Sequence, residues 1–235
     1  MFSSSAALYD TIYSAFKDYR AETARLVELI RRDHPSAHTA LDVACGTGEH
    51  ARLLNSEHGF AVDGLDLDPE FVTIAQRKLA HGTVFRGNMT SFALDRRYDV
   101  VLCLFSSIGY VRTLENVERT LSCFRAHLAP HGIAVVEPWF APGAMESGYT
   151  TATAAKEDGV SVARVTRTIV DGRISRLEFE YLIGRATGIE HASEVHELGL
   201  FSTDELLECF RVAGLDAGYD PDGLSGRGLF VARVA

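Results

Sequence analysis

The segment of residues 41–48, LDVACGTG, carries the residue types and spacing that most clearly indicate ligand chemistry. Gly46 and Gly48 allow a tight turn and a close approach of a ligand to the backbone. A helix pattern follows, and its first N–H groups can face that ligand. Asp42 would repel a diphosphate, but it could receive the ammonium of an amino-acid-like ligand. The third glycine of the fingerprint G-x-G-x-x-G is absent, which weakens the alternative of an NAD dehydrogenase.

Two more polar positions follow predicted strands in the same half. Asp66 lies in the run GLDLD, where a carboxylate can bind both hydroxyls of a ribose. Asn88 and Met89 follow the next strand pattern and suit an adenine amino group and ring. Each position alone would more often be an ordinary turn or surface residue. In this order and spacing, the three elements resemble the motif set of S-adenosylmethionine-dependent methyltransferases.

This resemblance implies S-adenosylmethionine as the cofactor. Tyr13 belongs to an early tyrosine cluster that either covers the cofactor or packs an N-terminal helix. The residues expected to bind the cofactor are Tyr13, Asp42, Ala44, Gly46, Gly48, Asp66, Asn88 and Met89.

The elements that must position these residues alternate between strand and helix patterns. Strands are predicted at residues 39–44, 60–67, 83–87, 99–105 and 133–137, and helices at 22–32, 49–58, from 68, and at 114–128. Such alternation indicates βαβ units and a parallel sheet. The fold class is therefore α/β, with a Rossmann-like class I methyltransferase sheet.

The pattern becomes β-rich after Trp139. Residues 161–170 and 173–182 are joined by Asp171-Gly172, a strong hairpin signal, and residues 193–201 are extended. A helix is predicted at 203–213, with Thr203 as its N-cap and Gly214 after its end, and a last strand at 229–234. We expect residues 1–140 and 200–235 to form the cofactor domain, and residues 141–199 to form an inserted cap on the substrate side.

Composition limits the partners and the location. The chain has 235 residues, a net charge of −9 and 46% hydrophobic residues, so it is a poor general binder of nucleic acid or anionic membranes. Its four cysteines are widely spaced, and we expect free thiols in the cytoplasm. There is no signal-peptide pattern and no apolar run long enough to span a membrane. A monomer or a homodimer is expected.

The second half carries a narrower resemblance. FSSIGY at 105–110, VVEPW at 135–139, HASEVHELGLF at 191–201 and SGRGLFV at 225–231 resemble the N,N-dimethyltransferases of nucleotide-linked amino sugars, which finish desosamine and mycaminose. The likeness extends over nearly the whole chain and implies N,N-dimethylation of a TDP-linked deoxy amino sugar in antibiotic biosynthesis. Asn88 replaces the family's usual Asp, and one member has His where this chain has Tyr110.

A nucleotide sugar requires cations for its diphosphate. Arg227 lies between two glycines and could pair with phosphate in a bidentate manner, although a solvated turn is the ordinary alternative. Arginines on strands often only solvate an open face. The residues expected to bind substrate are Tyr19, Ser107, Glu137, Trp139, Arg164, Arg176, His191 and Arg227. His191, Glu194 and His196 do not form a recognised ligand motif, so no metal is expected.

Methyl transfer from a sulfonium is an in-line displacement, so the protein must align a neutral amine with the methyl group. Tyr110 is the residue expected to act on the amine. Its ordinary pKa of about 10 makes it a poor base, and we expect it to orient the amine. Two alternatives stay open: an O- or N-methyltransferase for another small acceptor, and a cofactor-binding regulatory module without catalysis.

Overall fold

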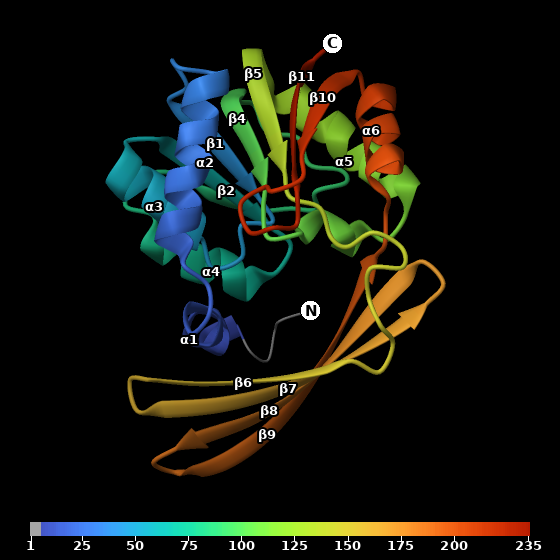
Figure 1. Ribbon diagram of the computed structural model, residues 1–235. Coiled ribbons are helices and arrows are strands. Elements are labelled where there is room, and N and C mark those ends of the chain that lie inside the picture. The colour runs from blue at the N-terminus through green and yellow to red at the C-terminus, as the bar shows by residue number, and fades with distance from the viewer. Residues whose placement is uncertain (1–5) are drawn as a thin grey trace.

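The computed structural model describes residues 6–235, which form two β-sheets and the helices around them (Figure 1). The larger sheet has the strand order β10-β11-β5-β4-β1-β2-β3. Strands β1 to β5 are parallel, and β11 and β10 join antiparallel at one edge. The bounds are β1 Thr39–Val43, β2 Ala61–Asp66, β3 Val84–Arg86, β4 Tyr98–Cys103, β5 Leu128–Val136, β10 Leu215–Asp220 and β11 Leu229–Val234.

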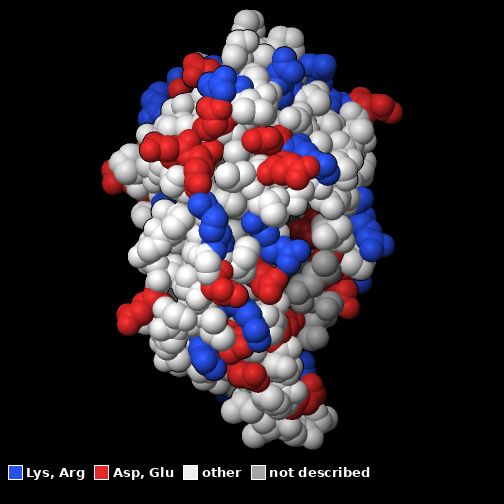
Figure 2. Space-filling model, turned by 90° about the vertical axis from the view of Figure 1, so that its right-hand side faces the viewer, with Lys and Arg blue, Asp and Glu red and all other residues white. Residues whose placement is uncertain are grey.

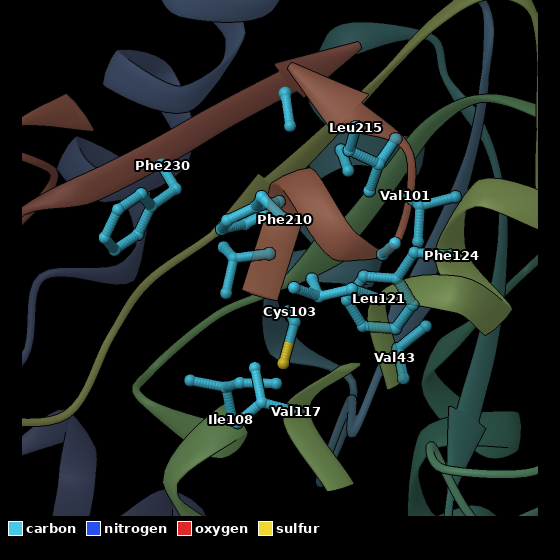
Figure 3. Packing of buried hydrophobic residues seen from close by; sticks show 14 of the residues in the cluster. Val43, Val101, Cys103, Ile108, Val117, Leu121, Phe124, Phe210, Leu215 and Phe230 are labelled. Atoms are coloured by element: carbon cyan, nitrogen blue, oxygen red, sulfur yellow. The ribbon is translucent and has the colours of Figure 1, made fainter. Parts of the chain in front are cut away.

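Helices cover both faces of this sheet. They are α2 Tyr19–Asp33, α3 Glu49–His58 and α4 Pro69–Lys78, followed by α5 Leu114–His127 and α6 Thr203–Val212. Alternate residues of β4 serve the two sides: Val100 and Leu102 pack in the cluster with α2 and α3, whereas Val101 and Cys103 pack with α5 and α6 (Figure 3). This two-sided burial explains the nearly continuous apolar run of this strand.

The strand order reverses between the neighbours β1 and β4. In open α/β sheets, ligands bind at the carboxyl ends of the strands at such a point. LDVACGTG and FSSIGY both leave the sheet there, so the topology brings the two motifs to one edge.

The second sheet is antiparallel, with the order β6-β7-β8-β9. Its strands are β6 Thr150–Glu157, β7 Val160–Asp171, β8 Ile174–Arg185 and β9 Gly188–Gly199. Figure 1 shows this sheet below the larger one, with α1 (Tyr9–Ser14) above it. Ile12 and Tyr13 pack against Phe179 and Tyr181 in a cluster of their own. All four strands lie within residues 141–199, while the division into domains stays a prediction.

The structure corrects several local predictions. Ser202, and not Thr203, caps α6, because it forms a capping box with Glu205. The two residues of the hairpin turn are Gly172 and Arg173, since Asp171 still pairs with Ile174. Strands β6 and β10 had no sequence prediction. β6 contains Ala, Lys and Glu, and β10 contains Asp and Gly, which are all depleted in strands; pairing with neighbouring strands makes both segments extended.

The helices, the cysteines and the surface charges are consistent with the predictions from composition. None of the helices in residues 6–235 has both the length and the apolar character that a membrane crossing requires. The four cysteines are free thiols, and Cys103 and Cys209 are buried. On the face drawn in Figure 2, acidic and basic side chains are interspersed and form no continuous basic field.

Candidate functional site

A cavity of about 1160 Å³ lies between the carboxyl ends of β1, β2 and β4 and the inner face of the second sheet. Residues of both sheets, of α1 and of the loops after β3 and β5 line it. The predicted site residues that line it are Tyr13, Ala44, Gly46, Asp66, Asn88, Met89, Ser107, Tyr110, Trp139, Arg164 and Arg227. The two sequence motif sets therefore meet at one site.

One half of the cavity is built around Gly46. Its φ is +56°, and a Cβ placed there would meet no protein atom within 4 Å, so it would project into open cavity. Its N–H donates to Asp66 Oδ2 at 2.8 Å, while Asp68 N–H donates to Asp66 Oδ1 at 2.9 Å. The Asp66 carboxylate is thus fixed at the wall of the cavity. Burial raises its pKa from the ordinary value.

Gly48 has a different role from the one predicted. It does not line the cavity, and a Cβ at this position would come within 2.9 Å of the Cβ of Ala75 in α4. Its φ of +76° at the start of α3 also favours glycine. The requirement for glycine here comes from the packing of α3 on α4.

Aromatic and amide groups complete this half. The ring centroids of Tyr9 and Tyr13 are 4.3 Å apart, and Tyr9 meets Phe71 at 5.2 Å, edge to face. Asn88 Oδ1, the oxygen expected to accept from adenine, already accepts hydrogen bonds from the N–H and the hydroxyl of Thr90. Those bonds fix the orientation of the Asn88 amide.

Asp42 is buried behind the cavity wall and does not line it. Burial raises the pKa of Asp42 to about 7, with the nearby Asp66 contributing in the same direction. Between about pH 4 and pH 7 the folded protein therefore keeps a proton that the unfolded chain has lost, and its stability falls as the pH rises through this range.

Asp42→Asn is consequently expected to stabilise the ligand-free protein more at pH 8 than at pH 5, by roughly 2–3 kcal/mol. Urea denaturation at both pH values measures the difference. Asp95→Asn, at an exposed aspartate, is the control and should show no such dependence. An equal gain from Asp42→Asn at both pH values would contradict the assignment.

The other half of the cavity contains Arg227. Its guanidinium lies over the Phe105 ring, 5.2 Å from the centroid, and its Nη1 donates to Ser106 Oγ at 3.4 Å. Glu137 lies beneath: its carboxylate accepts from Phe105 N–H at 2.6 Å and from Ser225 Oγ at 2.7 Å, and is 3.7 Å from Arg227 Nε. Glu137 is 1% exposed and does not line the cavity. The structure thus shows it as a support for Arg227.

Arg164 is the second cation of this half and is buried. Its guanidinium lies over the rings of Tyr13 and Phe179, and Nη1 donates to Tyr13 Oη at 3.3 Å. Its buried Nε has no hydrogen-bond partner within residues 6–235. A buried cation with an unpaired donor is costly unless an anion reaches it, so this half of the cavity suits an anionic ligand.

Trp139, Ser107 and Tyr110 lie along the wall of the cavity. The indole N–H of Trp139 donates to Ser175 Oγ at 2.8 Å, which holds its ring against the second sheet. The Tyr110 hydroxyl is 3.1 Å from His196 Nδ1. Strand alternation places His196 on the inner face of β9, so His196 and not the predicted His191 lines the cavity.

Besides Glu137, three other predicted substrate residues do not reach the cavity. Tyr19 packs edge to face on His50. Arg176 pairs with Glu178, and His191 pairs with Glu180, both with exposed side chains. Ser175, Leu177 and Phe179 point inward, so Arg176 must point outward. His191 and His196 differ by an odd number of positions and therefore lie on opposite faces of β9.

Comparisons with known proteins agree with this geometry. Residues 40–132 match the model of a methyltransferase domain. The dTDP-3-amino-3,6-dideoxy-alpha-D-glucopyranose N,N-dimethyltransferase of Streptomyces fradiae is 40% identical, over 96% of this chain and 89% of that protein. The crystal structure of Streptomyces venezuelae DesVI is 38% identical and superposes with a TM-score of 0.92 over 98% of both chains.

The structure of S-adenosylmethionine-bound CalS10, an amino pentose methyltransferase from Micromonospora echinaspora, is 35% identical, with a TM-score of 0.87 over 97% of both chains. The fold and the site thus define a class I methyltransferase. The chain belongs to the family of sugar N,N-dimethyltransferases.

Proposed function

We propose that this enzyme transfers methyl groups from S-adenosylmethionine to the amino group of a TDP-linked deoxy amino sugar and yields the N,N-dimethyl product in antibiotic biosynthesis. The observation that carries the proposal is a single cavity with the glycine-lined wall around Asp66 in one half and the buried cation Arg164 in the other. The names of the relatives support the same substrate class.

The residues of the first half fit the cofactor. Gly46 leaves room for a ligand against its Cα, and the fixed Asp66 carboxylate can accept hydrogen bonds from ribose hydroxyls. Tyr9, Phe71 and Met89 supply an apolar wall for a purine. When bound, S-adenosylmethionine supplies a methyl group already activated by its sulfonium.

The second half binds the acceptor. Arg164 and Arg227 are the cations for the diphosphate, and both are held in place before it arrives: Arg164 by aromatic rings, Arg227 by Phe105 and Glu137. Trp139 offers a flat surface for the sugar or the base. We propose that residues 141–199 form a substrate-side cap, because strands β7 to β9 supply the wall of this half.

We place the enzyme in the cytoplasm, where four free thiols persist, and expect it to act as a monomer or a homodimer. The alternative of a non-sugar acceptor has less support, because a small uncharged amine would leave Arg164 without an anion.

Mass spectrometry of the products tests the proposal. A TDP-linked amino sugar incubated with S-adenosylmethionine is expected to gain about 28 Da, the mass of two methylene units. The matched controls are the same amino sugar without its nucleotide and the same nucleotide sugar with a hydroxyl in place of the amine. Methylation of the hydroxyl compound, or equal rates with and without the nucleotide, would contradict the proposed function.

A further inference from the structure

A chain of polar groups lies behind the Tyr110 hydroxyl, and the methyl-transfer chemistry described above does not use it. Tyr110 Oη is 3.1 Å from His196 Nδ1, and His196 Nε2 is 3.4 Å from Glu194 Oε2. The Tyr181 hydroxyl donates to the same Glu194 oxygen at 3.4 Å. His196 and Glu194 are buried, whereas Tyr110 is 38% exposed and lines the cavity. The chain thus runs from the protein interior to the substrate space.

The hydrogen-bond partners of His196 determine which ring nitrogen carries its hydrogen and in which direction the Tyr110 O–H points. An ionised Glu194 carboxylate can only accept, and beside it the hydrogen of a neutral His196 ring belongs on Nε2. Nδ1 is then an acceptor, and the Tyr110 O–H donates to it. The lone pairs of the Tyr110 oxygen consequently face the cavity. A tyrosine hydroxyl can donate or accept in general, but here its single hydrogen is already used in the bond to His196 Nδ1.

The surroundings keep the His196 ring neutral and the Tyr110 hydroxyl protonated. Burial lowers the pKa of His196 from its ordinary value, so the ring is neutral at pH 7. Among the described residues, the groups that face it include Glu194 on its own strand, Arg164 on β7, Phe179 on β8 and Tyr110. Burial also raises the pKa of Tyr110 well above its ordinary range, so its hydroxyl keeps its hydrogen and is not a free-standing base.

We propose that His196, held in one tautomer by Glu194, fixes the Tyr110 hydroxyl as a hydrogen-bond acceptor for the substrate amine. This inference rests on the proposed function. An acceptor takes an N–H of the amine and leaves the nitrogen lone pair free to attack the methyl group. The opposite polarity would be inhibitory, because a donating hydroxyl would bind the lone pair itself. His196 and Glu194 are therefore positioning residues that act through Tyr110.

A Tyr110 hydroxyl that accepts a hydrogen bond from the amine is compatible with two successive methyl transfers. A primary amine and the secondary amine made from it each carry an N–H that can donate to Tyr110. The second transfer leaves one proton on the nitrogen; once that proton is lost to water, the tertiary amine carries no N–H, so the acceptor no longer holds the nitrogen. This polarity therefore favours a reaction that ends at the dimethyl product.

Glu194→Gln tests the proposal, because a glutamine amide can donate to Nε2 and allow the hydrogen to move to Nδ1. His196 would then donate to Tyr110, and the hydroxyl would donate to the amine. We expect kcat to fall by about 30- to 100-fold, with the KM for the nucleotide sugar nearly unchanged. Tyr110→Phe alone should cost about 10-fold or less, since only one hydrogen bond is lost.

The double variant is decisive. With no hydroxyl to reverse, the variant that combines Tyr110→Phe with Glu194→Gln should return to the rate of Tyr110→Phe alone, so Tyr110→Phe rescues Glu194→Gln. Glu190→Gln is the matched control, because Glu190 is an exposed glutamate on the same strand that pairs with Arg185; its kcat should equal that of the wild type. Calorimetry with S-adenosylmethionine establishes that every variant keeps a folded cofactor site.

Each outcome has a clear meaning. If the double variant is slower than either single variant, Glu194 supports the fold and the polarity proposal is wrong, while the proposed function stands. If Glu194→Gln matches the wild type, the proposal is equally wrong. If the wild-type enzyme methylates no amino sugar, the proposed function fails and this inference fails with it.

Discussion

Replacement of Gly46 by valine is expected to abolish S-adenosylmethionine binding while the protein stays folded. The Cβ of residue 46 would meet no protein atom within 4 Å, so the branched side chain would fill cavity space and not displace the core. The space it takes lies beside the Asp66 carboxylate, which accepts the Gly46 N–H. Isothermal calorimetry should therefore detect no binding, a loss of at least about 100-fold in affinity.

Backbone strain has to be separated from obstruction, because φ at Gly46 is +56° and a valine is strained there. Gly59 offers the control: its φ is +74°, and its Cβ would also meet nothing within 4 Å, but it ends α3 away from the cavity. Gly59→Val should lose a similar amount of stability and keep full cofactor affinity. If the two variants weaken binding equally, strain alone is responsible and Gly46 does not line the cofactor site.

The parallel sheet could be predicted because its signals are local. The apolar run of β4, the helix starting after Gly48 and the terminal strand β11 all lie where the sequence places them. The motifs at the carboxyl ends of β1 and β2 then follow from topology, since parallel strands end at one edge. The positions of cofactor residues such as Gly46 and Asp66 can be predicted from these local signals alone, and both residues line the cavity in the structure.

The substrate half was harder to predict because it depends on which face of a strand each residue occupies. Arg164 and Arg176 look alike in the sequence, yet the register of β7 and β8 turns one inward and the other outward. A shift of one residue would reverse them, and no turn residue reports it before the pairing is known. Glu137 and Arg227 lie far apart in the chain, in the motifs at 135–139 and 225–231. Their contact could not be predicted from either motif alone.

The last prediction compares Arg227, which lines the cavity, with Arg176 on the outer face of the second sheet. Arg227→Ala should raise the KM for the TDP-linked amino sugar by about 10- to 100-fold, because a charge-assisted contact with the diphosphate contributes about 1.5–3 kcal/mol. The affinity for S-adenosylmethionine should stay the same, since Arg227 lies against Phe105 and Ser106 and not beside Asp66. Steady-state kinetics measures the first quantity and calorimetry the second.

Two further variants separate charge from position. Arg227→Lys keeps the positive charge but not the planar fork, so it should recover part of the lost affinity. Arg176→Ala removes an arginine of the outer face, where it pairs with Glu178, and the KM should change by no more than about twofold. The reverse order, with Arg176→Ala the more damaging, would mean that the acceptor lies on the outer face of the second sheet. Weakened S-adenosylmethionine binding in Arg227→Ala, with the KM for the acceptor unchanged, would place the 225–228 loop in the cofactor half and remove the main local support for a nucleotide-linked substrate.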